Sequence, residues 1–148
     1  MHLCFGNYGG QRIQSGTWAK LVSFFERIRA DHVVLELARP GYGDLDRLRD
    51  LGPELRLGIG VIDIKTTVVE TPAEVAARIQ AAATALGGAE RIAYVNPDCG
   101  FWMLARSIAD AKIHALVAGR DLFEGRTVNR VIQVSDPRRL DTSPNRGA

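Results

Sequence analysis

The sequence lacks the features of a membrane-spanning or exported protein. Among its 148 residues, no apolar run approaches the roughly 18 residues that a membrane helix needs, and no charged segment followed by an apolar one marks a secretion signal. Basic and acidic residues are nearly balanced, at 19 and 17, so charge gives no reason to expect nucleic acid or acidic membranes as partners. We therefore expect a cytoplasmic protein that binds neither.

Cysteine is also scarce, with Cys4 and Cys99 as the two examples. In a reducing cytosol, free thiols or metal ligands are a better expectation for such a pair than a disulfide. The length and the 46% apolar content suit one domain with a substantial core.

Strand-like and helix-like segments alternate along the chain. Short runs rich in Val, Ile and Leu predict strands, and apolar residues at helical spacing between them predict helices. The strands are expected at 2–5, 32–37, 56–64 and 91–97, and the helices at 17–30, 44–49, 71–86 and 103–123. Four such βα units require a parallel sheet, which is either an open doubly wound sheet or half of a (β/α)₈ barrel.

The C-terminal region carries two further expectations. The helix at 103–123 is expected to turn these residues inward: Leu104, Ile108, Ala111, Ala115 and Leu122. Beyond it, 128–134 is a candidate short strand. Polar residues dominate 126–148, which we expect to be a disordered tail.

Reactive side chains gather at the expected carboxyl ends of the strands, where the sites of α/β proteins lie. His2 and Cys4 are two residues apart on the first strand and so share a face. Glu36 lies near the end of the second strand, and Cys99 follows the fourth. One imidazole, one carboxylate and two sulfurs on one rim match a zinc shell. Because zinc deprotonates a thiol that binds to it, such a site would present a substrate thiolate to an alkyl donor.

Four segments together resemble the cobalamin-independent methionine synthase family, and more closely its shorter methionine synthase-like members. They are HLCFGN, VVLELA, GIGVIDIK with VVETP, and VNPDCG, in unbroken order between His2 and about Gly125. The resemblance implies a (β/α)₈ barrel of the uroporphyrinogen decarboxylase and methionine synthase type. It also implies a zinc ion held by His2, Cys4, Glu36 and Cys99.

The same resemblance implies a reaction. The family's zinc activates homocysteine, or in related enzymes another small thiol, for attack on a methyl or alkyl donor such as 5-methyltetrahydropteroyltriglutamate. The epoxyalkane:coenzyme M transferases are similar in this respect, with an epoxide as the electrophile. We therefore expect a small thiol and a methyl or alkyl donor as the partners of this chain.

Two departures from the family pattern limit this expectation. Where methionine synthases carry a histidine after the third strand, this chain has Lys65, which favours the methionine synthase-like branch. The family barrel also has about four further βα units before the first strand seen here. Residues 1–125 are therefore expected to be the C-terminal half of a barrel, followed by the tail at 126–148. A natural half barrel and a shortened gene model both fit that expectation.

Several site residues have structural alternatives. Asp63 and Lys65 are catalytic candidates, but they share a strand face and an ion pair between them is an equal alternative. Glu36 lies in an apolar strand, where a buried carboxylate needs a partner, and a salt bridge to Arg39 is the alternative to a metal.

Asn96 and Asp98 are substrate-binding candidates, and their alternative role is to shape the turn that aims Cys99. The function has alternatives as well. A half barrel leaves its first and last strands without neighbours, and free edges invite pairing. The chain could thus be an inactive or partner-dependent fragment that pairs with itself or with a separate N-terminal half. An alkyl transferase that uses coenzyme M or another thiol is the remaining alternative.

Overall fold

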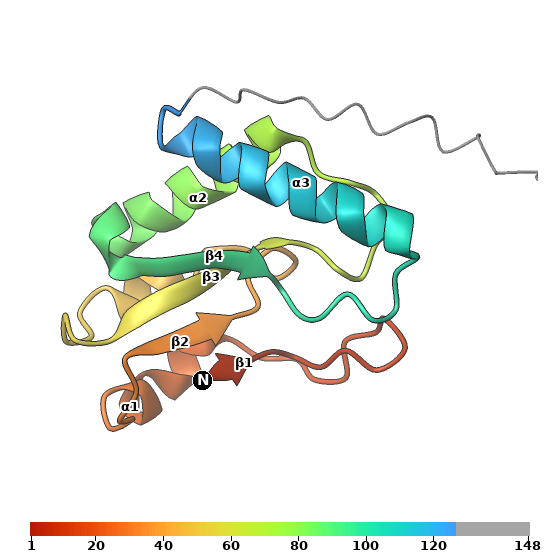
Figure 1. The fold of residues 1–148 in the computed structure, drawn as a ribbon. Helices are drawn as coiled ribbons and strands as arrows, with labels where there is room; N and C mark the ends of the chain where they lie inside the picture. Colours follow the sequence, from red (N-terminus) through yellow and green to blue (C-terminus); the bar gives the residue numbers. More distant parts are fainter. Residues whose placement is uncertain (127–148) are drawn as a thin grey trace, which may run out of the picture.

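A four-stranded sheet lies at the centre of the structure, a computed structural model that describes residues 1–126. All neighbouring strands are parallel and their order follows the chain, β1-β2-β3-β4 (Figure 1). The strands are β1 (His2–Leu3), β2 (His32–Leu35), β3 (Arg56–Ile62) and β4 (Ile92–Pro97). A doubly wound sheet reverses its order at a switch point, whereas sequential parallel strands form an arc of a (β/α) barrel. The expected half barrel is confirmed.

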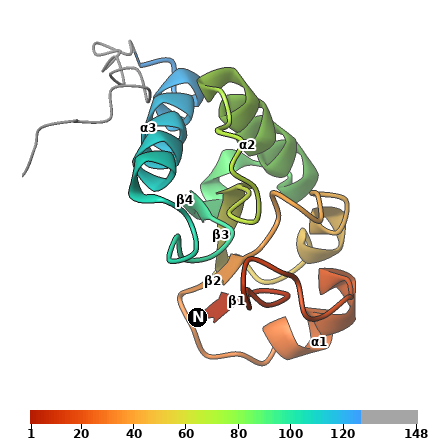
Figure 2. The same cartoon turned by 90° about the vertical axis from the view of Figure 1, so that its right-hand side faces the viewer.

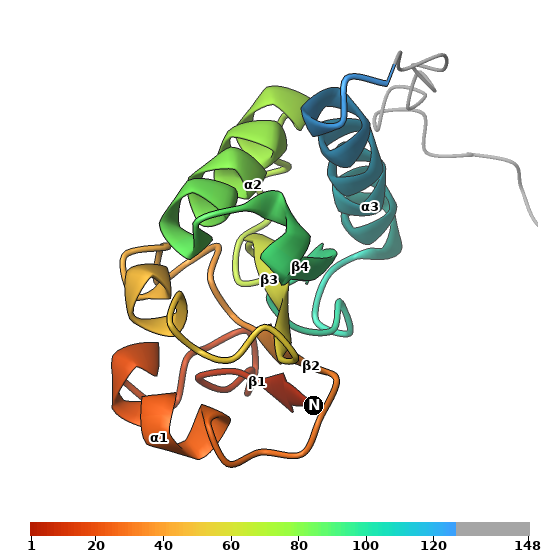
Figure 3. The same ribbon diagram turned by 90° about the vertical axis from the view of Figure 1, so that its left-hand side faces the viewer.

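The helices follow the strands, as predicted, and wrap around one side of the sheet (Figures 2 and 3). They are the 3₁₀ turn η1 (Trp18–Leu21), α1 (Val22–Phe25), η2 (Leu45–Leu48), α2 (Pro72–Leu86), η3 (Ala89–Arg91) and α3 (Arg106–Phe123). Within the part of the chain that the structure places, no helix has the length and apolar character to cross a membrane. The structure does not describe the candidate strand at 128–134. Of the expected tail at 126–148, it describes the first residue.

The first helix is much shorter than the predicted 17–30. It divides into η1 and a single turn of α1 that ends at Phe25. Tertiary contacts shape its beginning: the Trp18 backbone N–H donates to Asp44, and its indole N–H donates to the carbonyl of Glu36. These two bonds anchor the buried Trp18 to the loops after β2, and such contacts override helix propensity.

Helix α2 has the boundaries that its sequence signals predict. Thr71 and Glu74 form a reciprocal capping box at its start, with Pro72 in the first turn. Gly87 ends the helix with a left-handed φ of 83°, a conformation that glycine adopts without strain. Residues at its own two ends therefore fix where α2 begins and where it stops.

The two faces of the sheet differ in chemistry. Leu35 and Ile59 lie side by side in the sheet and are fully buried under the helices. The next residues back along the strands, Val34 and Gly58, belong to the opposite face, which is the interior face of the arc. On that face Tyr94 remains 54% exposed and meets the ring of His32 edge-on. The apolar core thus lies on the helix side, and the interior side is more open.

Helix α3 turns the predicted face inward except at its C-terminal end, and the contact includes two residues that were not predicted. Ala115 is buried as expected, but Leu122 is exposed, and Lys112 and Gly119 fill the contact instead. Gly119 is required there because a Cβ would overlap the side chain of Val75 on α2. Close packing of the two helices thus places Lys112 beneath the loop that leaves β3.

Lys112 holds that loop through a buried charge. Its Nζ donates to the carbonyls of Asp63 and Val68 and to Glu70, at 2.8 Å from Oε2. Arg78 contacts the other Glu70 oxygen. Burial by itself raises the pKa of Glu70, but hydrogen bonds from Lys112 and from the Asp63 N–H outweigh burial, and the pKa is lowered. Lys112 therefore ties the loop at 63–70 to α3.

Replacing Lys112 with Met should destabilise the protein by about 3 kcal/mol, because Glu70 loses its closest cation while it stays buried. Urea unfolding measures this change. Since the folded pKa of Glu70 is lowered, the part of the stability due to its ionised form should disappear as the pH falls through that pKa. Arg106→Met, at a side chain that is 94% exposed, is the control and should have no measurable effect. Equal effects of the two substitutions would contradict the anchoring role.

Candidate metal centre

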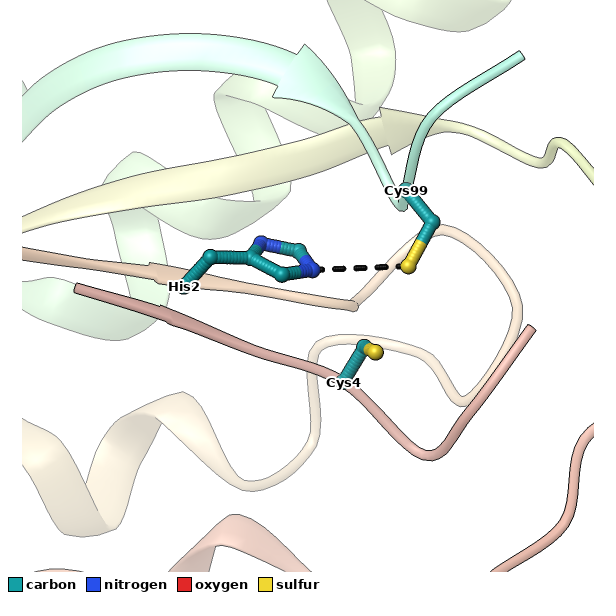
Figure 4. A group of neighbouring side chains, drawn as sticks. All are labelled: His2, Cys4 and Cys99. Atoms are coloured by element: carbon teal, nitrogen blue, oxygen red, sulfur yellow. Dashed lines mark hydrogen bonds between the residues drawn. The ribbon is translucent and has the colours of Figure 1, made fainter. Parts of the chain in front are cut away.

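Three of the predicted donors converge at the carboxyl edge of the sheet. Nε2 of His2 lies 3.4 Å from Sγ of Cys99, although the two residues are 97 positions apart (Figure 4). One ligand atom each from His2, Cys4 and Cys99 all lie within 4.8 Å of one another. In Figure 4 the His2 ring and the Cys99 sulfur point toward each other, and Cys4 lies beside them.

This convergence depends on the curvature of the sheet. His2 belongs to the first strand and Cys99 follows the last, with β2 and β3 between them. In a flat sheet, three strand spacings would separate the outer strands by roughly 14 Å. Side chains of histidine and cysteine cannot bridge that distance to 3.4 Å from parallel positions. The donors meet because the arc curls and they lie on its concave side.

The protonation states of the donors suit a metal site. Partial desolvation of the ring, together with the nearby N-terminal amine, lowers the pKa of His2 despite the Glu36 carboxylate. The imidazole is therefore neutral near pH 7 and has a free lone pair. Burial and a hydrogen bond with Cys4 raise the pKa of Cys99 to about 12. Without a metal this thiol keeps its proton, and a metal that binds must displace it.

Asp98 positions the turn that carries Cys99. Its Oδ1 accepts the N–H groups of Leu37 and Ala38 at 2.8 Å, and Oδ2 accepts the N–H of Arg39 at 3.1 Å. Gly60 on β3 leaves room for this carboxylate, which a Cβ at that position would overlap. Burial raises the pKa of Asp98 to about 6, although the three N–H donors act in the opposite direction. Both oxygens are occupied by the backbone, which favours the turn-shaping alternative over substrate binding.

Asn96 lies in β4 just before this turn. Its Nδ2 donates to the carbonyl of Pro97 at 2.9 Å, and its Oδ1 is buried without a hydrogen-bond partner among the residues that the structure describes. The neighbouring loop is tied down by Asn7, whose Nδ2 donates to the carbonyl of Gly100. Asn96 thus lies close to Cys99 in the chain, and its role in substrate binding stays a prediction.

Glu36 is fully buried beside the cluster but is not one of the three residues whose ligand atoms come together. Its Oε1 lies 2.8 Å from Nζ of Lys65, and its Oε2 accepts the backbone N–H of Phe5 at 2.7 Å. The partner is therefore a lysine from the loop after β3, and both carboxylate oxygens are engaged.

The ion pairs differ from both alternatives considered for these residues. Asp63 pairs with Arg39 at 3.2 Å, and Glu36 pairs with Lys65. Neither an Asp63–Lys65 pair nor a Glu36–Arg39 pair occurs within 1–126. The reason is that β3 ends at Ile62, so strand alternation does not apply to residues 63–65. Instead, Oδ1 of Asp63 accepts the Lys65 backbone N–H in a tight turn, and the lysine side chain turns inward.

The support beneath the site was not foreseen. Lys112 and Glu70 hold the loop that carries Asp63 and Lys65, yet neither stood out as a site residue. One signal was available: Lys112 lies between Ile108 and Ala115 on the face of α3 that was expected to be apolar. A charged residue on an inward helical face predicts a buried ion pair.

The donor set fits a zinc ion. One imidazole and two cysteine sulfurs are a combination that binds zinc, and three protein ligands leave the fourth tetrahedral position for a water or substrate. The donors come from two separated chain segments, residues 2–4 at and just after β1 and the turn after β4, as is usual for sites on barrel rims. Chemistry and placement therefore agree.

Comparisons with known proteins connect this arrangement to a family. The profile described as "Cobalamin-independent synthase, Catalytic domain" matches residues 14–120. A "Methionine synthase" of Thermococcus kodakarensis is 34% identical over 122 residues, which cover 82% of this chain and 32% of the relative. A "Methionine synthase" of Saccharolobus solfataricus is 32% identical over 119 residues, with 80% and 32% covered. The chain thus spans about a third of the length of these curated relatives.

A solved structure shares the fold. A B12-independent methionine synthase from Shewanella sp. W3-18-1, determined in complex with selenomethionine, superposes with a TM-score of 0.68 at 22% identity. The match covers 84% of this chain and 38% of that protein. At this identity the similarity supports the barrel arc that the strand order indicates.

Gly60→Ala should disrupt the Asp98 turn, because the new methyl group overlaps the carboxylate. We expect a loss of about 2 kcal/mol in the free energy of unfolding, as for other overpacked sites, and faster hydrogen exchange at the amides of residues 37–39. Gly43→Ala is the matched control, since a Cβ there meets nothing within 4 Å. Unchanged exchange in Gly60→Ala would show that Asp98 does not hold this loop.

Proposed function

Because the chain belongs to the family of cobalamin-independent synthase catalytic domains, we propose that it carries the zinc-binding, thiol-activating part of a thiol S-alkyltransferase. The observation that supports this most strongly is the cluster of His2, Cys4 and Cys99 within 4.8 Å on the concave rim of the sheet. The reaction would be methyl or alkyl transfer to a small thiol.

The protein supplies the donor set and its support. His2, Cys4 and Cys99 would hold the zinc ion, with the fully buried Glu36 next to them as the fourth candidate. When bound, zinc would lower the pKa of a substrate thiol so that it reacts as a thiolate near neutral pH. Asp98 aims the Cys99 turn, and Asp63 orders the turn that brings Lys65 inward. Asn96 is the candidate for contact with the substrate.

Homocysteine is the proposed thiol because relatives of the chain are named methionine synthases. The proposed electrophile is a methyl donor such as 5-methyltetrahydropteroyltriglutamate. Since the chain spans about a third of those relatives, residues that bind the methyl donor would come from another segment or chain. A cytoplasmic location is part of the same proposal, because free thiols at the site require a reducing compartment.

A partner-dependent role is the second candidate. In the sheet as described, β1 and β4 each have one strand neighbour. Tyr94 is also half exposed on the interior face, which a closed barrel fills with side chains. Either self-association or a separate N-terminal half would cover this face and complete the substrate site.

Zinc content decides whether the site forms. The purified wild-type chain should bind about one zinc ion, and Cys99→Ser should weaken zinc affinity by at least tenfold, because a thiolate ligand is lost. His114→Ala is the matched control, since His114 is exposed on α3, and it should bind zinc like the wild type. Elemental analysis and chelator competition provide the measurements. Absence of zinc from folded wild-type protein would contradict the proposal.

Activity separates the two candidates. The zinc-loaded chain is assayed with homocysteine and with coenzyme M against methyl donors. Turnover by the chain alone supports an autonomous transferase. Zinc binding without turnover for every pair supports the partner-dependent role.

A further inference from the structure

The outer edge of β4 differs from the rest of the sheet in its burial. Residues 57–62 of the neighbouring strand β3 are all buried, whereas no residue of β4 (Ile92–Pro97) is buried in the part of the chain that the structure describes. Strands of a parallel sheet are normally covered on both faces. Within residues 1–126, β4 has one strand neighbour and its other edge is free (Figures 1 and 3). This strand thus has the sequence of an interior strand at the edge of the sheet.

A groove of about 430 Å³ follows this free edge. Its apolar lining includes Ile92 and Val95 of β4 and Leu116 and Phe123 of α3. All four side chains are partly buried and pack against the core. An apolar groove beside a row of free backbone groups fits one more strand, which would pair with β4 and cover these side chains at the same time.

The chain reaches the amino end of this groove as it leaves α3. Phe123 and Glu124, at the end of the helix, line the groove together with Ile92, the first residue of β4. The segment that follows Arg126 therefore starts close to the point where β4 itself starts. Parallel neighbours need a crossover connection, and α3 is already in place as the crossover between β4 and a further strand.

Helix α3 also ends with the same turn that leads from α2 to β4. Gly87 after α2 and Gly125 after α3 both have left-handed φ values, 83° and 66°. In each turn the N–H of the glycine donates to the carbonyl three residues back, and the next N–H donates to the carbonyl five residues back. These paired bonds form a glycine-based helix end. The chain thus leaves α3 in the local geometry that precedes β4.

The segment after this turn has the composition and length of a strand. Residues 128–134 read VNRVIQV and begin three residues after Gly125. β-Branched residues, which favour strands, make up four of the seven positions. Alternation places Val128, Ile132 and Val134 on one face. Seven residues equal the length of β3 and exceed that of β4 by one, so the segment can span the whole groove.

We propose that 128–134 forms a fifth parallel strand on the outer edge of β4 and fills the groove between β4 and α3. The segment is tethered at the end of the groove, which gives it an effective concentration on the order of millimolar and an advantage over a second copy of the chain. This inference does not depend on zinc binding. A separate N-terminal half could then pair with the sheet at β1, but would have to displace 128–134 to pair with β4.

Amide-resolved hydrogen exchange of the full chain tests this pairing. In the wild type, amides of 128–134 and the outward amides of β4 should be protected equally at low and high protein concentration. Ile132→Asp should expel the segment from the apolar groove, so that both sets of amides exchange at least about tenfold faster. Leu140→Asp is the matched control, because Leu140 is an apolar residue beyond the proposed strand, and it should exchange like the wild type. Unchanged exchange in α2 shows that each variant is folded.

Four results would overturn the inference. The first is exchange of 128–134 at the rate of an unstructured peptide in the wild type. Protection that falls on dilution would identify a second copy as the occupant, and β4 protection that survives Ile132→Asp would identify another occupant. Should Ile132→Asp fail to fold, nuclear Overhauser effects between backbone protons of 92–97 and 128–134 decide in dilute wild-type protein: their presence supports the pairing, and their absence is the fourth result. Zinc content tests the proposed function separately.

Discussion

The buried carboxylate of Asp98 is the contact on which the arrangement of the rim depends. It extends from the turn after β4, across Gly60 on β3, to three N–H groups of the segment after β2. One side chain thus fixes two loops relative to each other over an intervening strand. Because Glu36 immediately precedes the bound segment and Cys99 immediately follows Asp98, the same contact sets the relative positions of both.

The buried carboxylates at the rim each have hydrogen-bonding or charged partners. Asp98 is satisfied by backbone N–H groups, Glu36 by Lys65 and Phe5, and Glu70 by Lys112 and Arg78. Burying a carboxylate is costly unless it is paired and hydrogen-bonded, so each pairing is a condition for folding as well as a feature of the site. The clustered donors are more accessible than these supports: His2 is exposed, and Cys4 and Cys99 are partly exposed. Rigid buried groups therefore hold reactive groups that a ligand can reach.

Local sequence signals predicted the fold well where the structure depends on local chemistry. Apolar runs located all four strands, and Thr71, Pro72 and Gly87 marked the bounds of α2. The predicted helix at 17–30 instead begins as a 3₁₀ turn at Trp18, whose partners lie on another loop. The predicted contact face of α3 omits Lys112, because this polar residue is buried through partners on a segment more than 40 positions away. Non-local contacts of this kind leave no periodic pattern in the sequence.

In the candidate site, too, some features could be predicted from the sequence and others depend on non-local contacts. The spacing of His2 and Cys4 and the position of Cys99 at a strand end were enough to predict that the three would meet, because strand ends share an edge. The partners of Glu36 and Asp63 were not predictable by strand alternation. The chain leaves the strand at Ile62, and the direction of Lys65 then depends on one hydrogen bond to Asp63.

The two ends of the concave face depend on different parts of a barrel. At the carboxyl end, every contact that places the donors, from Asp98 to Lys65, lies within the four strands and their loops. Toward the other end, Tyr94 stays half exposed beside the ring of His32 when residues 1–126 alone are considered. In a closed barrel, side chains from the remaining strands fill this interior. Within residues 1–126, contacts inside the four strands and their loops thus set the donor geometry, whereas the interior face around Tyr94 stays open.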